Sequence, residues 1–167
     1  LLLQDESSGG GSTISQQLAK NLFPRKNHGI FSMPVNKTRE AIIATRLEKA
    51  YTKEEIITLY LNTVPFGDNT FGIESAAGKF YSKKARELTL AESAVLIGML
   101  KASHLYNPRV FPERSKTRRD VVLNQMSRYG YLTAEEVSIA KSQKLQLSYR
   151  GFSHEDGLAP YFREQVR

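Results

Sequence analysis

Three features of the sequence predict an almost wholly α-helical fold. Apolar residues recur with helical spacing in segments near 13–22, 34–51, 53–62, 72–80, 90–102, 112–129 and 133–143. Short turns separate these segments, and helix-start signals open several of them. No stretch alternates clearly between apolar and polar residues, as a half-buried strand would. We therefore expect an all-α domain, and 167 residues suffice for one such domain with a real core.

Capping boxes support these helix starts. In such a box a threonine hydroxyl accepts a hydrogen bond from a backbone N–H, and the side chain of a Glu or Gln three residues later accepts one from the threonine N–H. The pattern occurs at Thr13 with Gln16, Thr52 with Glu55, Thr89 with Glu92, and Thr133 with Glu136. Pro34 and Pro112 suit the first turn of two further helices.

The segment 90–100 is nearly all apolar, which predicts the central buried helix. Gly98 within it lowers helix stability and indicates a close contact with another helix. On the helix after Pro112, the pair Arg118 and Arg119 is expected to lie on a solvated basic face.

Composition limits the chemistry and the partners. Because there is no cysteine, disulfides, thiol nucleophiles and zinc–thiolate sites are excluded. The three histidines have no ligand spacing, so we expect no metal site; no cofactor is required, and a divalent cation is left open. No apolar run approaches the ~20 residues that span a bilayer. The net charge of +7 favours an anionic partner, either nucleic acid, an acidic membrane surface or a phosphorylated substrate.

Glycines 9–11 run into the start of the first helix. Backbone N–H groups there would form an anion site at the positive end of the helix dipole, and Lys20 lies two turns along the same face as Thr13. The residues also fit a flexible loop with a good cap. Gln16 and Gln17 add amide groups to this segment.

Glu40 is the candidate catalytic residue, because it shares a helix face with Ile43, Ala44 and Leu47. A carboxylate on a core-facing stripe must be paired or functional, since unpaired burial of its charge is costly. Lys37, three residues earlier, lies beside it, and an ordinary surface Lys–Glu pair is the alternative. A third candidate is Asn62, at the end of an apolar helix, where it is either a helix-end residue or a hydrogen-bonding site residue.

Four runs of sequence resemble motifs of the peptidoglycan glycosyltransferase family of class A penicillin-binding proteins. GGSTISQQLAKN at 10–21 is similar to the family's GGSTITQQ motif, and NKTREA at 36–41 to its RKxxEA motif. KEEIITLYLNTVPFGDNTFGIESAAGKFY at 53–81 resembles the next motif. LTLAESAVLIGMLKASHLYNP at 88–108, with RSKTRRDVVLNQM at 114–126, resembles the last one. Four long motifs in the right order make a chance match implausible.

The resemblance implies a lysozyme-like helical fold with a small membrane-facing jaw lobe. It implies polymerisation of lipid II, in which the acceptor 4-hydroxyl attacks the anomeric carbon of the lipid-linked glycan chain, with inversion and loss of undecaprenyl pyrophosphate. It places the domain on the periplasmic, outer face of the bacterial cytoplasmic membrane, anchored by a segment not present in this chain. By position, Glu40 matches the family's second catalytic glutamate, and Lys20 and Lys37 match basic residues that contact the diphosphate. The resemblance also implies that the cleft is lined by Ser12, Thr13, Gln16, Gln17 and Asn21. Arg39 and Asn62 are also assigned to substrate binding.

The chain departs from the family in two places. No E-D-x-x-F-x-x-H-x-G run, which carries the general base, precedes the glycines, so residues 1–147 are expected to be an N-terminally truncated glycosyltransferase domain that is inactive alone. Asn36 stands where the family usually has Arg, and Arg39 and Arg25 are the candidates to compensate.

Residues 148–167 are expected to be a linker and the start of a following unit, in the family often a transpeptidase domain, and 159–162 resemble that junction. Other cell-wall synthesis proteins are then expected partners, and nucleic acid is not. Two other functions stay open: a lysozyme-like glycan hydrolase, and a basic helical module that binds nucleic acid.

Overall fold

The computed structural model describes residues 12–150, and this part of the chain is mostly helical. Its elements in order are α1 (Ile14–Leu22), α2 (Ser32–Ala50), α3 (Lys53–Thr63), β1 (Pro65–Gly67), β2 (Thr70–Phe71), α4 (Ile73–Tyr81), the 3₁₀ turn η1 (Ala85–Glu87), α5 (Leu90–Met99), α6 (Pro112–Arg128) and α7 (Ala134–Ser142). Each predicted helix is present, and α2 begins two residues earlier than expected.

The four predicted capping boxes are confirmed at the starts of α1, α3, α5 and α7. In each, the threonine hydroxyl accepts a hydrogen bond from the backbone N–H three residues on, and the side chain of that residue accepts one from the threonine N–H. Removal of such a cap costs about 1 kcal/mol, so these short signals fix where the helices begin.

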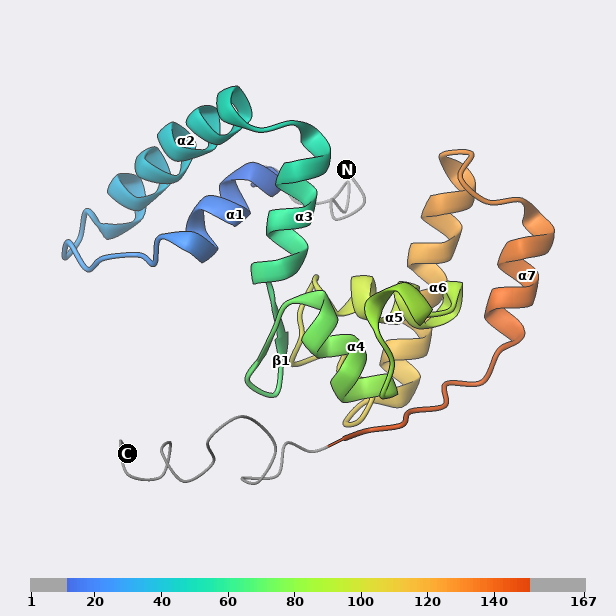
Figure 1. Ribbon diagram of the computed structural model, residues 1–167. Helices are drawn as coiled ribbons and strands as arrows, with labels where there is room; N and C mark the ends of the chain where they lie inside the picture. The colour runs from blue at the N-terminus through green and yellow to red at the C-terminus, as the bar shows by residue number, and fades with distance from the viewer. Residues whose placement is uncertain (1–11, 151–167) are drawn as a thin grey trace.

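The helices form two lobes (Figure 1). In the smaller lobe α2 packs mainly against α1, and α3 packs against α1. In the larger lobe α5 packs against α6, with α4 and α7 around this pair. The β1–β2 hairpin and the contact between α3 and α4 join the lobes. No helix within residues 12–150 combines the length and the apolar character needed to cross a bilayer.

The prediction that 90–100 forms the central buried helix is confirmed. On α5, Val95, Leu96 and Met99 are almost fully buried, and each such side chain contributes roughly 1.5–3 kcal/mol. The close helix contact predicted at Gly98 is confirmed as well, because a Cβ placed there would lie 3.0 Å from the Cγ of Arg118 on α6.

Two details of the larger lobe differ from the sequence prediction. The hairpin β1–β2 was not expected; Asp68 and Asn69, with φ of 49° and 55°, turn the chain between strands too short to show an alternating pattern. The prediction of a solvated basic face is wrong for Arg119, which is fully buried. Its guanidinium donates to Asp120 and to the carbonyls of Lys141 and Gln143, and so ties α6 to the end of α7.

The described chain ends in a segment that docks on α4. The N–H groups of Ser148 and Arg150 donate to the carbonyls of Phe80 and Lys79, at 3.0 Å and 2.8 Å. The ring of Tyr149 packs on Phe80 with its centroid 5.9 Å away. Residues 148–150 therefore contact the larger lobe directly. The domain boundary at 147/148 stays a prediction, and the junction expected at 159–162 lies outside the described residues.

Candidate active site

Glu40 is a buried carboxylate in the smaller lobe, with 5% of its surface exposed. It lies on the face of α2 that also buries Asn36 and Ala44. The burial of Ala44 agrees with the helical spacing that singled Glu40 out in the sequence, whereas Ile43, which that spacing placed on the same face, lines a groove elsewhere on α2. Burial of an ionised carboxylate requires compensation by nearby charges or hydrogen bonds.

Arg25 provides most of that compensation from the loop between α1 and α2. Its Nε donates to Glu40 Oε1 at 2.8 Å, and its Nη2 donates to Oε2 at 3.3 Å. A two-pronged bond of this kind fixes the orientation of the carboxylate as well as its charge. The Arg25 hydrogen bond lowers the pKa of Glu40 below its ordinary value, against the opposing effect of burial, and Lys37 adds to the lowering. Glu40 is therefore ionised at neutral pH.

Lys37 connects Glu40 to the start of α1. Its Nζ lies 3.4 Å from Glu40 Oε2 and donates a 2.6 Å hydrogen bond to the Ser12 hydroxyl. The Lys37 side chain is 44% exposed, so its ammonium group is open to a ligand from solvent. One carboxylate and two cations thus meet beside the N-terminal end of α1.

Asn36, the residue at the position where the motif usually has Arg, is 2% exposed and fully engaged. Its Oδ1 accepts from the N–H of Lys26 at 3.1 Å, and its Nδ2 donates to the carbonyl of Lys26 at 2.8 Å. The same Nδ2 donates to the carbonyl of Ser32. Asn36 therefore fixes the backbone immediately after Arg25.

The candidates on α1 form a polar row joined to α3. Gln17 donates to the carbonyl of Ser12 and accepts a 3.1 Å hydrogen bond from the hydroxyl of Tyr60. Thr13 and Gln16 are occupied with the helix cap. The side-chain nitrogen of Asn21 is buried and has no hydrogen-bond partner among residues 12–150. The anion site predicted at glycines 9–11 lies outside the described residues.

The structure does not bring three candidates into contact with Glu40. Lys20 is exposed, and no ion pair or hydrogen bond of its side chain occurs within residues 12–150. Arg39 points to the loop instead, where its Nη1 donates to the carbonyl of Pro24 at 3.3 Å and its guanidinium lies over the Phe23 ring. Asn62 is exposed on α3. The substrate-binding roles of these three residues stay predictions.

Arg25 was named in the sequence only as one of two replacements for the missing motif arginine. In the structure Arg25 contacts Glu40, whereas Arg39 contacts the carbonyl of Pro24. Tyr60 was missed altogether. Its contact with Gln17 spans 43 positions of sequence, and its surroundings in the apolar run of α3 look like ordinary core. The basic run that follows Pro24 was the available signal for Arg25.

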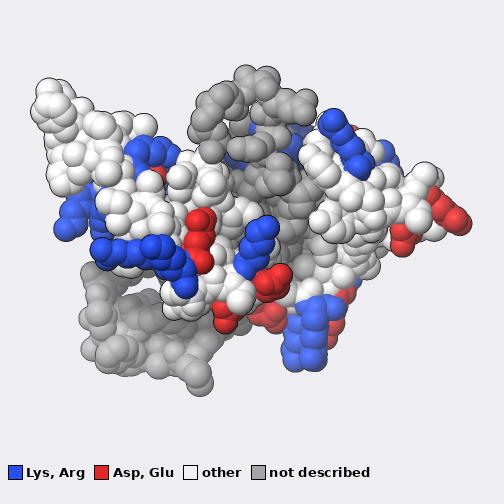
Figure 2. Space-filling view, turned by 90° about the horizontal axis from the view of Figure 1, so that it is seen from above, with Lys and Arg blue, Asp and Glu red and all other residues white. Residues whose placement is uncertain are grey.

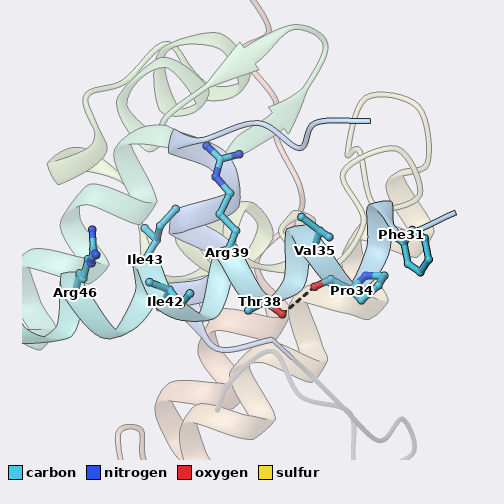
Figure 3. A pocket seen from close by; sticks show the side chains of 8 residues that line it. All are labelled: Phe31, Pro34, Val35, Thr38, Arg39, Ile42, Ile43 and Arg46. Carbon is cyan, nitrogen blue, oxygen red and sulfur yellow. Dashed lines mark hydrogen bonds between the residues drawn. The ribbon is translucent and has the colours of Figure 1, made fainter. Parts of the chain in front are cut away.

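A shallow groove of about 690 Å³ lies on the opposite face of α2 from Glu40. Figure 3 shows its lining, which consists of Phe31, Pro34, Val35, Thr38, Arg39, Ile42, Ile43 and Arg46. Most of these side chains are apolar, and Phe31 is 63% exposed. Within residues 12–150 there is no group of His, Asp or Glu side chains arranged to hold a metal ion.

Comparison with known proteins gives one family. The transglycosylase family model matches residues 2–127. The chain is 40% identical over 138 residues to penicillin-binding protein 1F of Bacillus subtilis, covering 83% of this chain and 19% of that protein. It is 38% identical over 167 residues to penicillin-binding protein 1A of Pseudomonas aeruginosa, covering 100% of this chain and 20% of that protein.

A solved structure agrees with these relatives. The crystal structure of penicillin-binding protein 1A from Haemophilus influenzae superposes with a TM-score of 0.55 and 27% identity, over 90% of this chain and 19% of that one. The chain thus spans about a fifth of the length of the relatives that it matches. The likeness favours neither the hydrolase nor the nucleic-acid module. The chain belongs to the transglycosylase family, and the relatives that it matches are penicillin-binding proteins.

Proposed function

We propose that the full-length protein containing this chain polymerises lipid II into glycan strands by inverting transfer, with release of undecaprenyl pyrophosphate. The observation that carries the proposal is the cluster in which Arg25 and Lys37 flank buried Glu40. Two cations against one carboxylate leave a net positive charge, and both cationic side chains are partly exposed. A site of this charge suits a diphosphate.

In this mechanism the smaller lobe binds and stabilises the leaving group. As the bond from the anomeric carbon to the pyrophosphate oxygen breaks, negative charge grows on the diphosphate. Lys37, held in place by Glu40 and Ser12, stabilises that charge. Because Glu40 is ionised, its part is to orient and retain the cations rather than to donate a proton. Pyrophosphate is a good leaving group, so a strong acid is not needed.

The remaining candidates on α1 are assigned to the substrate. The side-chain nitrogen of Asn21, which is buried and has no hydrogen-bond partner within residues 12–150, is assigned to the substrate by motif position. Ser12, Gln16 and Gln17 lie along the same helix start, and Lys20 is assigned to the diphosphate by motif position. The general base belongs to a motif that these 167 residues do not contain. We accordingly expect no polymerisation by the isolated chain.

The groove on α2 supports a membrane-facing orientation. Apolar side chains at the tip of the smaller lobe are well exposed, among them Ile30 at 90% and Phe31 at 63%. Figure 2 shows an uncharged surface at the left-hand tip with Lys and Arg side chains beside it. Apolar groups flanked by cations suit the boundary of an anionic bilayer. We place the domain at the outer face of the cytoplasmic membrane, anchored from outside this chain, with a transpeptidase domain and cell-wall synthesis proteins as partners.

The first prediction tests Glu40 in the full-length protein. Glu40→Gln removes the negative charge that retains Arg25 and Lys37, so lipid II turnover should fall by about two orders of magnitude or more. The helical content should be unchanged, because the amide has nearly the same shape. Glycan chain length on gels and lipid II consumption measure the effect.

The matched control is Glu48→Gln, which removes an exposed carboxylate from the same helix. It should polymerise lipid II at the wild-type rate. Near-normal turnover by Glu40→Gln would remove Glu40 from the mechanism. Release of sugar fragments from purified cell-wall glycan would instead support the hydrolase.

A further inference from the structure

The Glu40 site of the proposed function contains an arginine that none of the matched motifs supplies. Arg25 belongs to the loop between α1 and α2, and its contact with Glu40 joins residues 15 positions apart. Such a contact needs a fixed loop, because an arginine on a freely moving loop would lose much side-chain and backbone entropy on binding.

The loop is fixed by Asn36. Both backbone polar groups of Lys26 are bound by the one buried amide, the N–H by Oδ1 and the carbonyl by Nδ2. This pair of bonds copies the way two β-strands pair, and it holds the residue next to Arg25 against α2. Asn36 and Glu40 are four residues apart on α2, so they lie on the same face of the helix.

A third contact closes the loop from the other side. Arg39 donates to the carbonyl of Pro24, so the residues before and after Arg25 are both bound to side chains of α2. The backbone on both sides of Arg25 is therefore held, and its guanidinium is bonded to both oxygens of Glu40. Its Nη1 donates to the sulfur of Met33 at 3.6 Å.

We propose that Arg25 is the positioning residue of Glu40, and that Asn36 sets the place of Arg25 by binding the backbone of Lys26. The inference rests on the proposed function. In this arrangement the Arg25 guanidinium holds the Glu40 carboxylate, and the buried Asn36 amide fixes the position of Arg25. Arg25 acts through Glu40 and Lys37 on the leaving group.

The test compares Arg25→Ala, Arg25→Lys and Asn36→Ala with wild type in the full-length protein, using initial rates of lipid II polymerisation. Arg25→Ala should lower kcat by roughly 100-fold, the effect of a misplacement of about 1 Å in a catalytic group, with KM for lipid II little changed. Arg25→Lys should recover only part of the loss, because an ammonium cannot bind both carboxylate oxygens in a fork. Asn36→Ala should lower kcat about tenfold.

The matched control is Lys26→Ala, because it removes a neighbouring positive charge and leaves the backbone groups that Asn36 binds. It should polymerise at the wild-type rate. Added guanidinium should restore activity to Arg25→Ala, whereas urea, which is neutral and of similar shape, should not. A purely structural role for Arg25 in the loop would give no difference between the two additives.

The pH profile supplies a second readout. Without Arg25, the burial of Glu40 raises its pKa with less opposition, so the rate of Arg25→Ala should begin to fall at a higher pH than that of wild type. Identical acid limbs would contradict the inference. A crystal structure of Asn36→Ala, which does not depend on activity, should show the Arg25 guanidinium beyond hydrogen-bond distance of Glu40.

Failure of the inference is distinct from failure of the proposed function. If wild type polymerises lipid II and Arg25→Ala does so equally well, the inference is wrong and the function stands. If wild type does not polymerise lipid II, the function is wrong, and the Asn36→Ala structure still decides the inference: an unmoved Arg25–Glu40 pair would overturn it.

Discussion

At the scale of single residues, the buried charges of this domain are compensated by partners distant in sequence. Glu40 was recognised from its position on an apolar helix face, but only its neighbour Lys37 could be inferred from helical spacing. The stronger partner, Arg25, comes from a loop whose path no local pattern determines. For Arg119 the sequence prediction was wrong. Two adjacent arginines suggest a solvated basic face, but the Arg119 side chain is buried between α6 and the end of α7.

The enclosure of Arg119 predicts a stability effect. Arg119→Ala leaves the carbonyls of Lys141 and Gln143 without donors and opens a cavity beside Leu145, so the free energy of unfolding should fall by about 3 kcal/mol. Chemical denaturation followed by circular dichroism measures it. Lys116→Ala on the exposed side of the same helix is the control and should change little. A loss for Arg119→Ala no greater than that of the control would show that the buried guanidinium does not hold α7.

At the scale of elements, the passage from α3 to α4 depends on one glycine. Gly72 precedes α4 with a φ of 83°, and a Cβ at this position would lie 2.7 Å from the carbonyl oxygen of Asn62. The N–H of Gly72 also donates to the carbonyl of Val64. The connection between the two lobes therefore includes one position, Gly72, at which a side chain does not fit.

Gly72→Ala should therefore destabilise the domain by about 2 kcal/mol, from backbone strain and the contact with Asn62. Gly78→Ala is the matched control, since it lies inside α4, where the added Cβ would meet nothing within 4 Å beyond the adjacent residues and backbone of its own helix, and it should stabilise by about 0.5–1 kcal/mol. Denaturation midpoints of the two variants give the comparison. The explanation fails if both variants shift the midpoint in the same direction.

The helices could be predicted because their signals are local. Thr52 with Glu55 and Thr133 with Glu136 each place both halves of a cap within four residues, and both capping boxes are present in the structure. The β1–β2 hairpin could not be predicted, because its strands have three and two residues, and the two residues between them, Asp68 and Asn69, take positive φ although neither is glycine. The contact between Tyr60 and Gln17 likewise depends on how α1 and α3 pack.

At the scale of the whole molecule, the two lobes have different roles. The larger lobe supplies most of the apolar core around α5, with α6 packed against α5 and the segment 148–150 docked on α4. The smaller lobe carries the Glu40 cluster on one face of α2 and the exposed apolar groove on the other. A single helix thus lies between a site suited to a diphosphate and a surface suited to a bilayer.

The apolar groove on α2 has its own prediction. Phe31→Ser together with Ile42→Ser lowers the apolar area of the groove, so binding of the protein to anionic vesicles should weaken about tenfold if the proposed membrane contact is there. Vesicle sedimentation measures it. Val121→Ser, an exposed apolar residue on α6, is the control. Equal binding by the groove variant and this control would place the membrane contact elsewhere.

The central claim is that the cations retained by Glu40 stabilise a departing diphosphate, and affinity for inorganic pyrophosphate tests it most directly. Calorimetric titration of the full-length protein should give a Kd that rises at least about tenfold in Lys37→Ala, because a charge-assisted contact is lost. Lys49→Ala, which removes an exposed lysine from the same helix, should leave the Kd unchanged. Equal affinities in wild type and Lys37→Ala would contradict the account.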